Sequence, residues 1–139
     1  MTSSQPVLTP QALIFTPDNK HCFAYSGELA STTSAQTALE FGTNSEYIIF
    51  EAFFTGPIQF GDPNTGREAN WQISLNDQVI ALIRTDTSES DVKNQGYLKF
   101  VVPPFAILKI EVDTNDAAAY QNCVLLTGQA FGMTDTGYQ

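Results

Sequence analysis

The sequence predicts an all-β protein, an antiparallel two-sheet sandwich of about eight strands arranged as a jelly roll. From Cys22 onward, short apolar runs alternate with clusters of Gly, Asn, Asp, Thr and Pro, which is typical of strands joined by turns. Only 15% of the residues are charged, against roughly 25% in ordinary globular proteins, and this disfavours a long helical bundle. A length of 139 residues fits one such domain.

We expect three segments along the chain. Residues 1–20 form an extended N-terminal arm, residues 21–133 form the jelly-roll sandwich and residues 134–139 form a short C-terminal tail. Proline fixes its own backbone dihedral and biases the preceding residue towards extended geometry. The arm contains Pro6, Pro10 and Pro17.

The clearest element is a hairpin that turns at Asn76 and Asp77, two residues that tolerate the positive φ angles of a tight turn. Strict alternation places Trp71, Ile73 and Leu75 on one face of its first strand. The return strand, Gln78–Thr85, is expected to alternate in the same way at Val79, Ala81 and Ile83.

The remaining strands and loops follow from the same pattern. Pro103 and Pro104 cannot donate to a strand ladder, so they mark a corner between strands. Thr55–Ala69 is predicted to be a long loop, with Ile58 and Phe60 as candidates for a short edge strand within it. Six further strands are predicted at Phe23–Leu29, Thr37–Phe41, Tyr47–Phe54, Tyr97–Val102, Ala106–Val112 and Asn122–Phe131.

The two cysteines, Cys22 and Cys123, lie near opposite ends of the chain. The first and last core strands of a jelly roll are neighbours in one sheet, so the two thiols are candidates for contact. Two interpretations stay open. Reduced cysteines that pack as small hydrophobic groups are favoured, and a disulfide is the alternative.

The charge balance excludes several classes of partner. Lys and Arg total 6 against 15 acidic residues, which gives a formal net charge of -9. The cations are scattered, whereas nucleic-acid binding needs them clustered, so no direct nucleic-acid binding is predicted. The N-terminal region has no basic n-region and no secretory apolar run, and no later run approaches the roughly 20 residues that span a bilayer. We therefore expect no signal peptide, synthesis in the cytoplasm and no membrane insertion.

The sequence contains no recognisable catalytic motif, and it predicts neither an enzyme nor a bound cofactor. His21 and its neighbour Cys22 point to opposite faces of a strand, so they cannot form a thiolate–imidazole pair locally. No Gly-x-Ser-x-Gly elbow, phosphate-binding loop or histidine cluster is present. Two carboxylates could act together as in glycosidases, but a solvated sheet face explains them better. The candidates are Glu28, Glu40, Glu46, Glu51 and Glu111.

Two other binding chemistries would depend on particular residues of the sequence. The Asp- and Asn-rich segments Asp62–Asn64 and Asp113–Asp116 offer oxygen ligands for calcium, but these residue types are also standard turn formers, so no metal site is predicted. Trp71 could stack on a sugar, although its position beside Ile73 on one strand face places it in the core. The tyrosines that could join such a platform are Tyr25, Tyr47, Tyr97 and Tyr120.

Low charge density and 10 Phe residues imply a large uncharged surface for so small a domain. Surfaces of this kind are usually buried against other subunits, and closed oligomers protect exposed sheet edges. We expect the Val7–Phe15 arm to clip onto a neighbour. The candidate interface residues are Val7, Leu8, Leu13, Ile14, Phe15, Pro57, Ile58 and Phe60.

Seven short segments occur in an order that resembles one group of proteins. They are Ala24–Gly27, Leu39–Phe41, Tyr47–Ile49, Ser74–Asn76, Val102–Phe105, Leu126–Gly128 and Phe131–Gly132. In this order the chain resembles small single-jelly-roll virion proteins of phages and other viruses, over roughly residues 22 to 132. The resemblance implies a capsid, vertex, minor capsid or decoration subunit, assembled as a trimer or pentamer and with other virion proteins. The arm lacks the basic residues of many small RNA-virus coat proteins, so genome contact is not implied.

The function expected from the sequence is therefore a structural virion protein, made in the host cytoplasm, that assembles through the sides of its sandwich and its extended arm. The alternative is a glycan- or receptor-binding jelly-roll module, such as a lectin-like domain or a phage fibre head. Because the acidic surplus makes free subunits repel one another, we expect assembly to improve as ionic strength rises.

Overall fold

The protein is all-β in the residues that the computed structural model describes. These residues are 14–15, 20–58, 68–88, 91–94, 96–115 and 120–132. They contain eleven strands and no helix, so the predicted fold class is confirmed.

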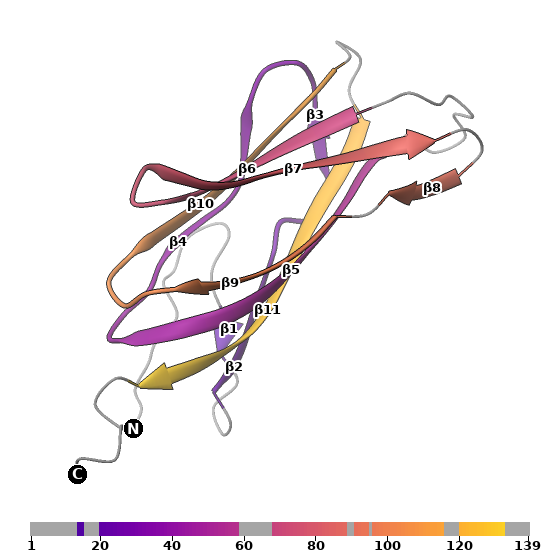
Figure 1. Ribbon diagram of the computed structural model, residues 1–139. Coiled ribbons are helices and arrows are strands. Elements are labelled where there is room, and N and C mark those ends of the chain that lie inside the picture. The colour runs from indigo at the N-terminus through magenta and orange to yellow at the C-terminus, as the bar shows by residue number, and fades with distance from the viewer. Residues whose placement is uncertain are drawn as a thin grey trace.

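The strands form two antiparallel sheets that face each other (Figure 1). The larger sheet has the order β1 (Ile14–Phe15), β2 (His21–Tyr25), β11 (Tyr120–Gly132), β5 (Glu46–Ile58) and β9 (Gly96–Val102), and β3 (Leu29–Ser31) also pairs with β11. The smaller sheet has the order β4 (Gln36–Gly42), β10 (Ile107–Thr114), β6 (Glu68–Leu75), β7 (Gln78–Ser88) and β8 (Asp91–Asn94).

The strand order is that of a jelly roll. Without the short strands β1, β3 and β8, the larger sheet reads β2-β11-β5-β9 and the smaller sheet reads β4-β10-β6-β7. The first and last of these core strands, β2 and β11, are neighbours, as predicted. In Figure 1, β5 and β11 run side by side along the length of the larger sheet.

The core lies between the two sheets and is formed by the inward side chains of both. Trp71 on β6 is fully buried, as predicted, and its ring packs on Phe54 of β5 with centroids 5.1 Å apart. Its indole Nε1 donates a hydrogen bond to Thr85 Oγ1 at 3.2 Å, which satisfies the polar group of a buried side chain. The ring of Phe50 on β5 packs edge-on against the ring of Phe41 on β4, with centroids 5.8 Å apart. These aromatic contacts join the two sheets.

The predicted hairpin turn between β6 and β7 is confirmed. Asn76 and Asp77 have φ angles of 51° and 67°, the left-handed geometry of a two-residue turn. Asn76 also ties the turn to β10, because its backbone N–H donates to Ile107 O and its Oδ1 accepts from Ile107 N, each at 2.9 Å.

One part of the hairpin prediction is wrong. Ile73 pairs with Ala81 but Ser74 pairs with Val79, so Ile80 is an extra residue at a register shift. An extra residue reverses the alternation of a strand. Val79 is therefore exposed instead of sharing the inward face of Ala81.

The predicted limits of one strand and of one loop are also wrong. The strand predicted at Phe23–Leu29 is split into β2 and β3, because the chain turns at Gly27, which has a φ of 74°. The loop predicted at Thr55–Ala69 is shorter, since β5 continues to Ile58 and β6 begins at Glu68.

Gly56 allows this extension of β5. It has a φ of 113°, and a Cβ at this position would lie 2.5 Å from Asn122 Oδ1 on β11. A residue without a side chain is needed both for the φ angle and for the close approach. The predicted edge-strand residue Ile58 is instead the end of β5, and Phe60 lies outside the described residues.

The two cysteines are free, which confirms the favoured interpretation. Although β2 and β11 are neighbours, Cys22 pairs in register with Gly128 and Cys123 pairs with Thr55. The thiols are therefore far apart along the strands, and this separation excludes a direct disulfide in the folded chain. Cys22 is buried in the core and Cys123 is partly buried.

Candidate functional site

The outward side of the larger sheet is the most unusual surface of the described structure. Side chains on β2, β11, β5 and β9 alternate between the core and the solvent. We call the outward set the aromatic face. It comprises His21, Phe23, Tyr25, Tyr47, Ile49, Glu51, Phe53, Thr55, Tyr97, Lys99, Val101, Cys123, Leu125, Thr127, Gln129 and Phe131.

One row of this face is apolar across all four strands. Tyr25 pairs with Leu125, Leu125 pairs with Phe53 and Phe53 pairs with Tyr97. The rings of Phe53 and Tyr97 lie 5.3 Å apart, a favourable cross-strand contact. Tyr25 and Tyr97 nevertheless remain 52% and 54% exposed. The row is thus a continuous apolar stripe that this chain leaves in contact with water.

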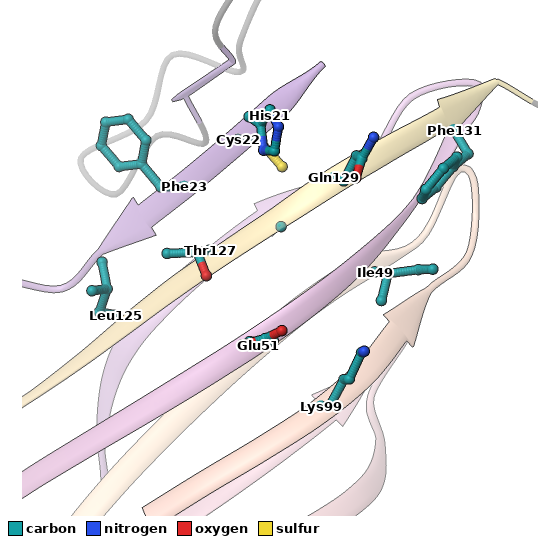
Figure 2. A pocket seen from close by; sticks show the side chains of 11 residues that line it. His21, Cys22, Phe23, Ile49, Glu51, Lys99, Leu125, Thr127, Gln129 and Phe131 are labelled. Carbon is teal, nitrogen blue, oxygen red and sulfur yellow. The ribbon is translucent and has the colours of Figure 1, made fainter. Parts of the chain in front are cut away.

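The next row is polar at its centre and forms a shallow depression of about 590 Å³ (Figure 2). Phe23 pairs with Thr127, Thr127 pairs with Glu51 and Glu51 pairs with Lys99. Figure 2 shows Glu51 on β5 beside Lys99 on β9, with Phe23 on the far side of β11. Opposite charges directly across a strand pair stabilise each other modestly.

The depression continues towards the end of the sheet where β5 begins. His21 pairs with Gln129, which in turn pairs with Ile49. Beyond them, Phe131 stacks on Tyr47 with ring centroids 5.3 Å apart. The depression is therefore bounded by aromatic rings at both ends and contains hydrogen-bonding side chains between them.

Two tyrosines of the face have perturbed acidities. The pKa of Tyr97 is raised above its usual value by loss of hydration and by the nearby Glu51 carboxylate. The pKa of Tyr25 is raised chiefly by Cys123, whose Sγ lies 2.6 Å from Thr55 Oγ1. Both phenols are neutral at pH 7, so they add aromatic surface and hydrogen-bonding groups without adding charge.

The outward side of the smaller sheet, which we call the polar face, is different. Asn70 Nδ2 donates to Asp113 Oδ1 at 3.0 Å, and Arg84 Nε donates to Asn70 Oδ1 at 3.3 Å. Arg84 also lies 3.8 Å from Glu68. The face comprises Glu40, Glu68, Asn70, Gln72, Val79, Leu82, Arg84, Ile107, Lys109, Glu111 and Asp113. Its polar groups are largely paired within the chain.

The interface residues predicted from the sequence do not include any member of the aromatic face. The backbone of Ile14 and Phe15 forms β1 and pairs with Phe23 and Cys22 of the same chain. Pro57 and Ile58 are the last two residues of β5. Three of the predicted arm residues and one loop residue lie outside the described structure: Val7, Leu8, Leu13 and Phe60.

A sequence signal for the aromatic face does exist. Three of its strands contain adjacent apolar pairs, in which one side chain points inward and the other outward. These pairs are Phe53–Phe54, Val101–Val102 and Leu125–Leu126. A strand that is solvated on one face has a polar residue at every second position, so such pairs mark strands that are apolar on both faces.

The carboxylates considered for catalysis are divided between the two faces of the sandwich. Glu51 lies on the aromatic face, whereas Glu40 and Glu111 lie on the polar face at the opposite side of the sandwich. Glu46 forms an ion pair with Lys20. In the described segments, no group of three or more His, Cys, Asp and Glu side chains could hold a metal ion.

The described residues considered as calcium ligands hydrogen-bond to other residues of the chain. Asp113 accepts a hydrogen bond from Asn70, and Asn115 Oδ1 accepts one from Glu68 N at 2.9 Å. Both side chains thus join neighbouring parts of the smaller sheet. The segment Asp62–Asn64 lies outside the described residues, and so does Asp116.

Across the part of the chain that the structure describes, no helix has the length and apolarity required to cross a membrane.

Comparison with known proteins gives no family. No protein-family model matches the chain, and no curated protein matches it in sequence. Solved structures with similar folds include dimeric latent PorU from Porphyromonas gingivalis, with 13% identity over 79% of this chain and a TM-score of 0.46. The VP2 subviral particle of infectious bursal disease virus matches with 11% identity over 90% of this chain and a TM-score of 0.42.

A third similar structure is the GH115 4-O-methyl-α-glucuronidase BtGH115A, with 17% identity over 75% of this chain and a TM-score of 0.37. The chain spans 11%, 37% and 14% of the PorU, VP2 and BtGH115A chains, respectively. At these identities and scores, the likenesses assign no function.

Proposed function

We propose that the protein is a structural virion subunit, a capsid, vertex or decoration protein, whose activity is assembly with copies of itself and with other virion proteins. The single observation that carries this proposal is the apolar row of Tyr25, Leu125, Phe53 and Tyr97, which crosses four strands and is exposed in the isolated chain. Contiguous apolar patches on soluble proteins usually mark interaction sites. The virion setting is supported by the resemblance of the seven structural segments.

The chemistry of the face suits a protein contact. Interface centres are rich in Tyr, Phe and aliphatic residues and poor in charge, and exposed Tyr and Phe side chains lose little conformational entropy on burial. The rim of the face adds polar groups such as Gln129 and His21. The proposal assigns no chemical reaction to the chain, and it includes no nucleic-acid contact because the net charge is -9.

Sedimentation velocity of the purified chain tests the proposal. We expect a trimer or pentamer at micromolar concentration, and an oligomer that becomes more stable as salt screens the acidic surplus. Removal of residues 1–20 is expected to weaken the oligomer. A chain that stays monomeric at every concentration and ionic strength, with or without the arm, would contradict the proposal.

A glycan-binding module is the second candidate, and the depression in Figure 2 favours it. Phe23 and Phe131 bound a cavity that also contains Glu51, Thr127 and Gln129, and sugars bind where an aromatic face meets hydrogen-bonding side chains. A glycan array tests this function. Binding that is lost in Gln129→Ala, and retained in the polar-face control Gln72→Ala, would support it. An array without hits would remove it.

A further inference from the structure

We propose that the aromatic face binds the aromatic face of a second copy of this chain across a two-fold axis. The inference deepens the proposed function and rests on it, because it names the surface and the partner of one assembly contact, the one that joins copies belonging to different trimers or pentamers. Three observations support it: the charge of the face, its self-complementary pattern and its size.

The charge distribution favours this face for contact between copies. The whole chain has a net charge of -9, so two copies repel each other in most orientations. The described aromatic face has one carboxylate and one ammonium group, Glu51 and Lys99, and is therefore close to neutral. Among the described side chains of the polar face, in contrast, there are four carboxylates, those of Glu40, Glu68, Glu111 and Asp113, and two cations. Two copies consequently approach through their aromatic faces with the least repulsion.

The pattern of the face is also self-complementary. A two-fold contact places the same patch on both subunits, so the patch must match itself. The apolar row of one copy can cover the apolar row of the other. Glu51 and Lys99 are direct cross-strand neighbours, so each copy brings a neutral pair of charges, and no net charge, to the contact. A partner of a different kind would need no such balance of one acid and one base.

The size of the face fits a reversible contact. Four strands about 4.8 Å apart, each contributing about six residues with a rise of about 3.3 Å, give a footprint of about 400 Å² per copy. Side-chain relief increases the buried accessible area, and two copies together then bury about 1,000 Å², the lower end for specific interfaces. An area of this size is typical of a weak contact that forms and dissociates reversibly.

Charge reversal with mixing is the decisive experiment. Glu51→Lys gives a face with two lysines, and Lys99→Glu gives a face with two glutamates. Each variant alone should associate at least about tenfold more weakly than the wild type, because like charges then meet across the contact. An equimolar mixture should recover association to within about threefold of the wild type, because opposite faces can pair. Sedimentation velocity measures all four samples.

Mixing separates a contact between copies from a role within one chain. In the mixture each chain still has a like-charged pair at positions 51 and 99, so an intrachain effect would not be rescued. Matched controls on the polar face are Gln72→Lys, Gln72→Glu and their mixture, which should all associate as the wild type does. Thr127→Lys and Thr127→Glu provide a second rescue pair if either reversal unfolds the chain, as judged by circular dichroism.

The outcomes distinguish the inference from the proposed function. Loss in each variant with recovery in the mixture supports the two-fold contact. Loss without recovery overturns it, and so does a wild-type oligomer that none of the face variants weakens; in the latter case the proposed assembly function survives through other surfaces. A wild-type chain that stays monomeric contradicts the proposed function itself.

Discussion

The two outer faces of the sandwich share one core but have opposite chemistry. On the polar face, Asp113, Asn70 and Arg84 form a hydrogen-bonded row across three strands, so its polar groups are paired within the chain. On the aromatic face, the corresponding row is apolar and more than half of the surface of Tyr25 and of Tyr97 is exposed. Polar groups of one face are therefore paired within the single chain, whereas the other face exposes a continuous apolar row that a partner would cover.

The number of exposed apolar residues does not by itself distinguish the aromatic face from the polar face. Leu82 on the polar face is 73% exposed, more than any residue of the apolar row. It pairs with Gln72, whose Nε2 donates to Glu111 Oε1 at 3.4 Å, so polar groups interrupt the apolar surface beside it. Continuity across strands distinguishes the aromatic face, and Leu82 therefore provides a control for it.

The largest effect on the free energy of unfolding is expected in the core that the two sheets share. Trp71→Ala should lower the free energy of unfolding by about 3–5 kcal/mol, because it opens a cavity against Phe54 and removes the hydrogen bond to Thr85. Denaturant unfolding followed by circular dichroism measures the loss. A change below about 1 kcal/mol would mean that the sheets do not share this core.

A second substitution pair compares the faces directly. Leu125→Asp places a charge in the middle of the apolar row and should weaken self-association by about a hundredfold, which is about 2.7 kcal/mol. The matched variant Leu82→Asp should leave association unchanged. Analytical ultracentrifugation over a concentration series gives both constants. Equal effects of the two substitutions would remove the distinction between the faces.

Alkaline pH tests the packing beneath the aromatic face. Burial, helped by the nearby Glu46 carboxylate, raises the pKa of the Cys22 thiol from 9.0 to about 12. Above pH 9 the unfolded chain loses this proton first, so stability present below pH 9 should fall by up to about 1.4 kcal/mol per pH unit as pH rises.

Urea unfolding at pH 8 to 10.5 measures this slope. The decrease of the free energy of unfolding with pH should be smaller in Cys22→Ala than in the wild type. Cys123→Ala changes a partly buried position on the same sheet, and it should reduce this decrease less than Cys22→Ala does. Identical slopes in the wild type and Cys22→Ala would show that this thiol is accessible to water.

The smallest effect is expected on the polar face. Asn70→Ala removes the side chain that connects Asp113 to Arg84, two exposed hydrogen bonds. We expect a loss of about 1 kcal/mol or less in the free energy of unfolding and no change in self-association. Thermal unfolding and sedimentation on the same sample check both. A variant that unfolds normally but fails to associate would place the contact on the polar face.

Much of the fold follows from local sequence patterns. Alternation predicted the inward position of Trp71, and the pair Asn76-Asp77 predicted the tight turn, because both depend on neighbouring residues alone. The extra residue at Ile80 and the continuation of β5 past Gly56 were missed. Both depend on cross-strand register, which is fixed by contacts between residues distant in the sequence.

The candidate site was harder to predict than the fold. The sequence predicts assembly through the sides of the sandwich and the arm, but the interface residues that it singles out lie only in the arm and the long loop. The aromatic face instead arises when four strands, from His21 to Phe131, come together in one sheet. The doublet Leu125–Leu126 shows that β11 is apolar on both sides, but only the register shows that Leu125 continues the row from Tyr25 to Phe53.

Hydroxyl-radical footprinting tests most directly whether the aromatic face is the surface that assembly covers. Side-chain oxidation is measured by mass spectrometry on the same protein at submicromolar and at high micromolar concentration. We predict that oxidation of Tyr25, Phe53 and Tyr97 falls severalfold as the chain associates, while oxidation of Leu82 stays constant. Association that leaves these three residues as reactive as in the dilute chain would contradict the account.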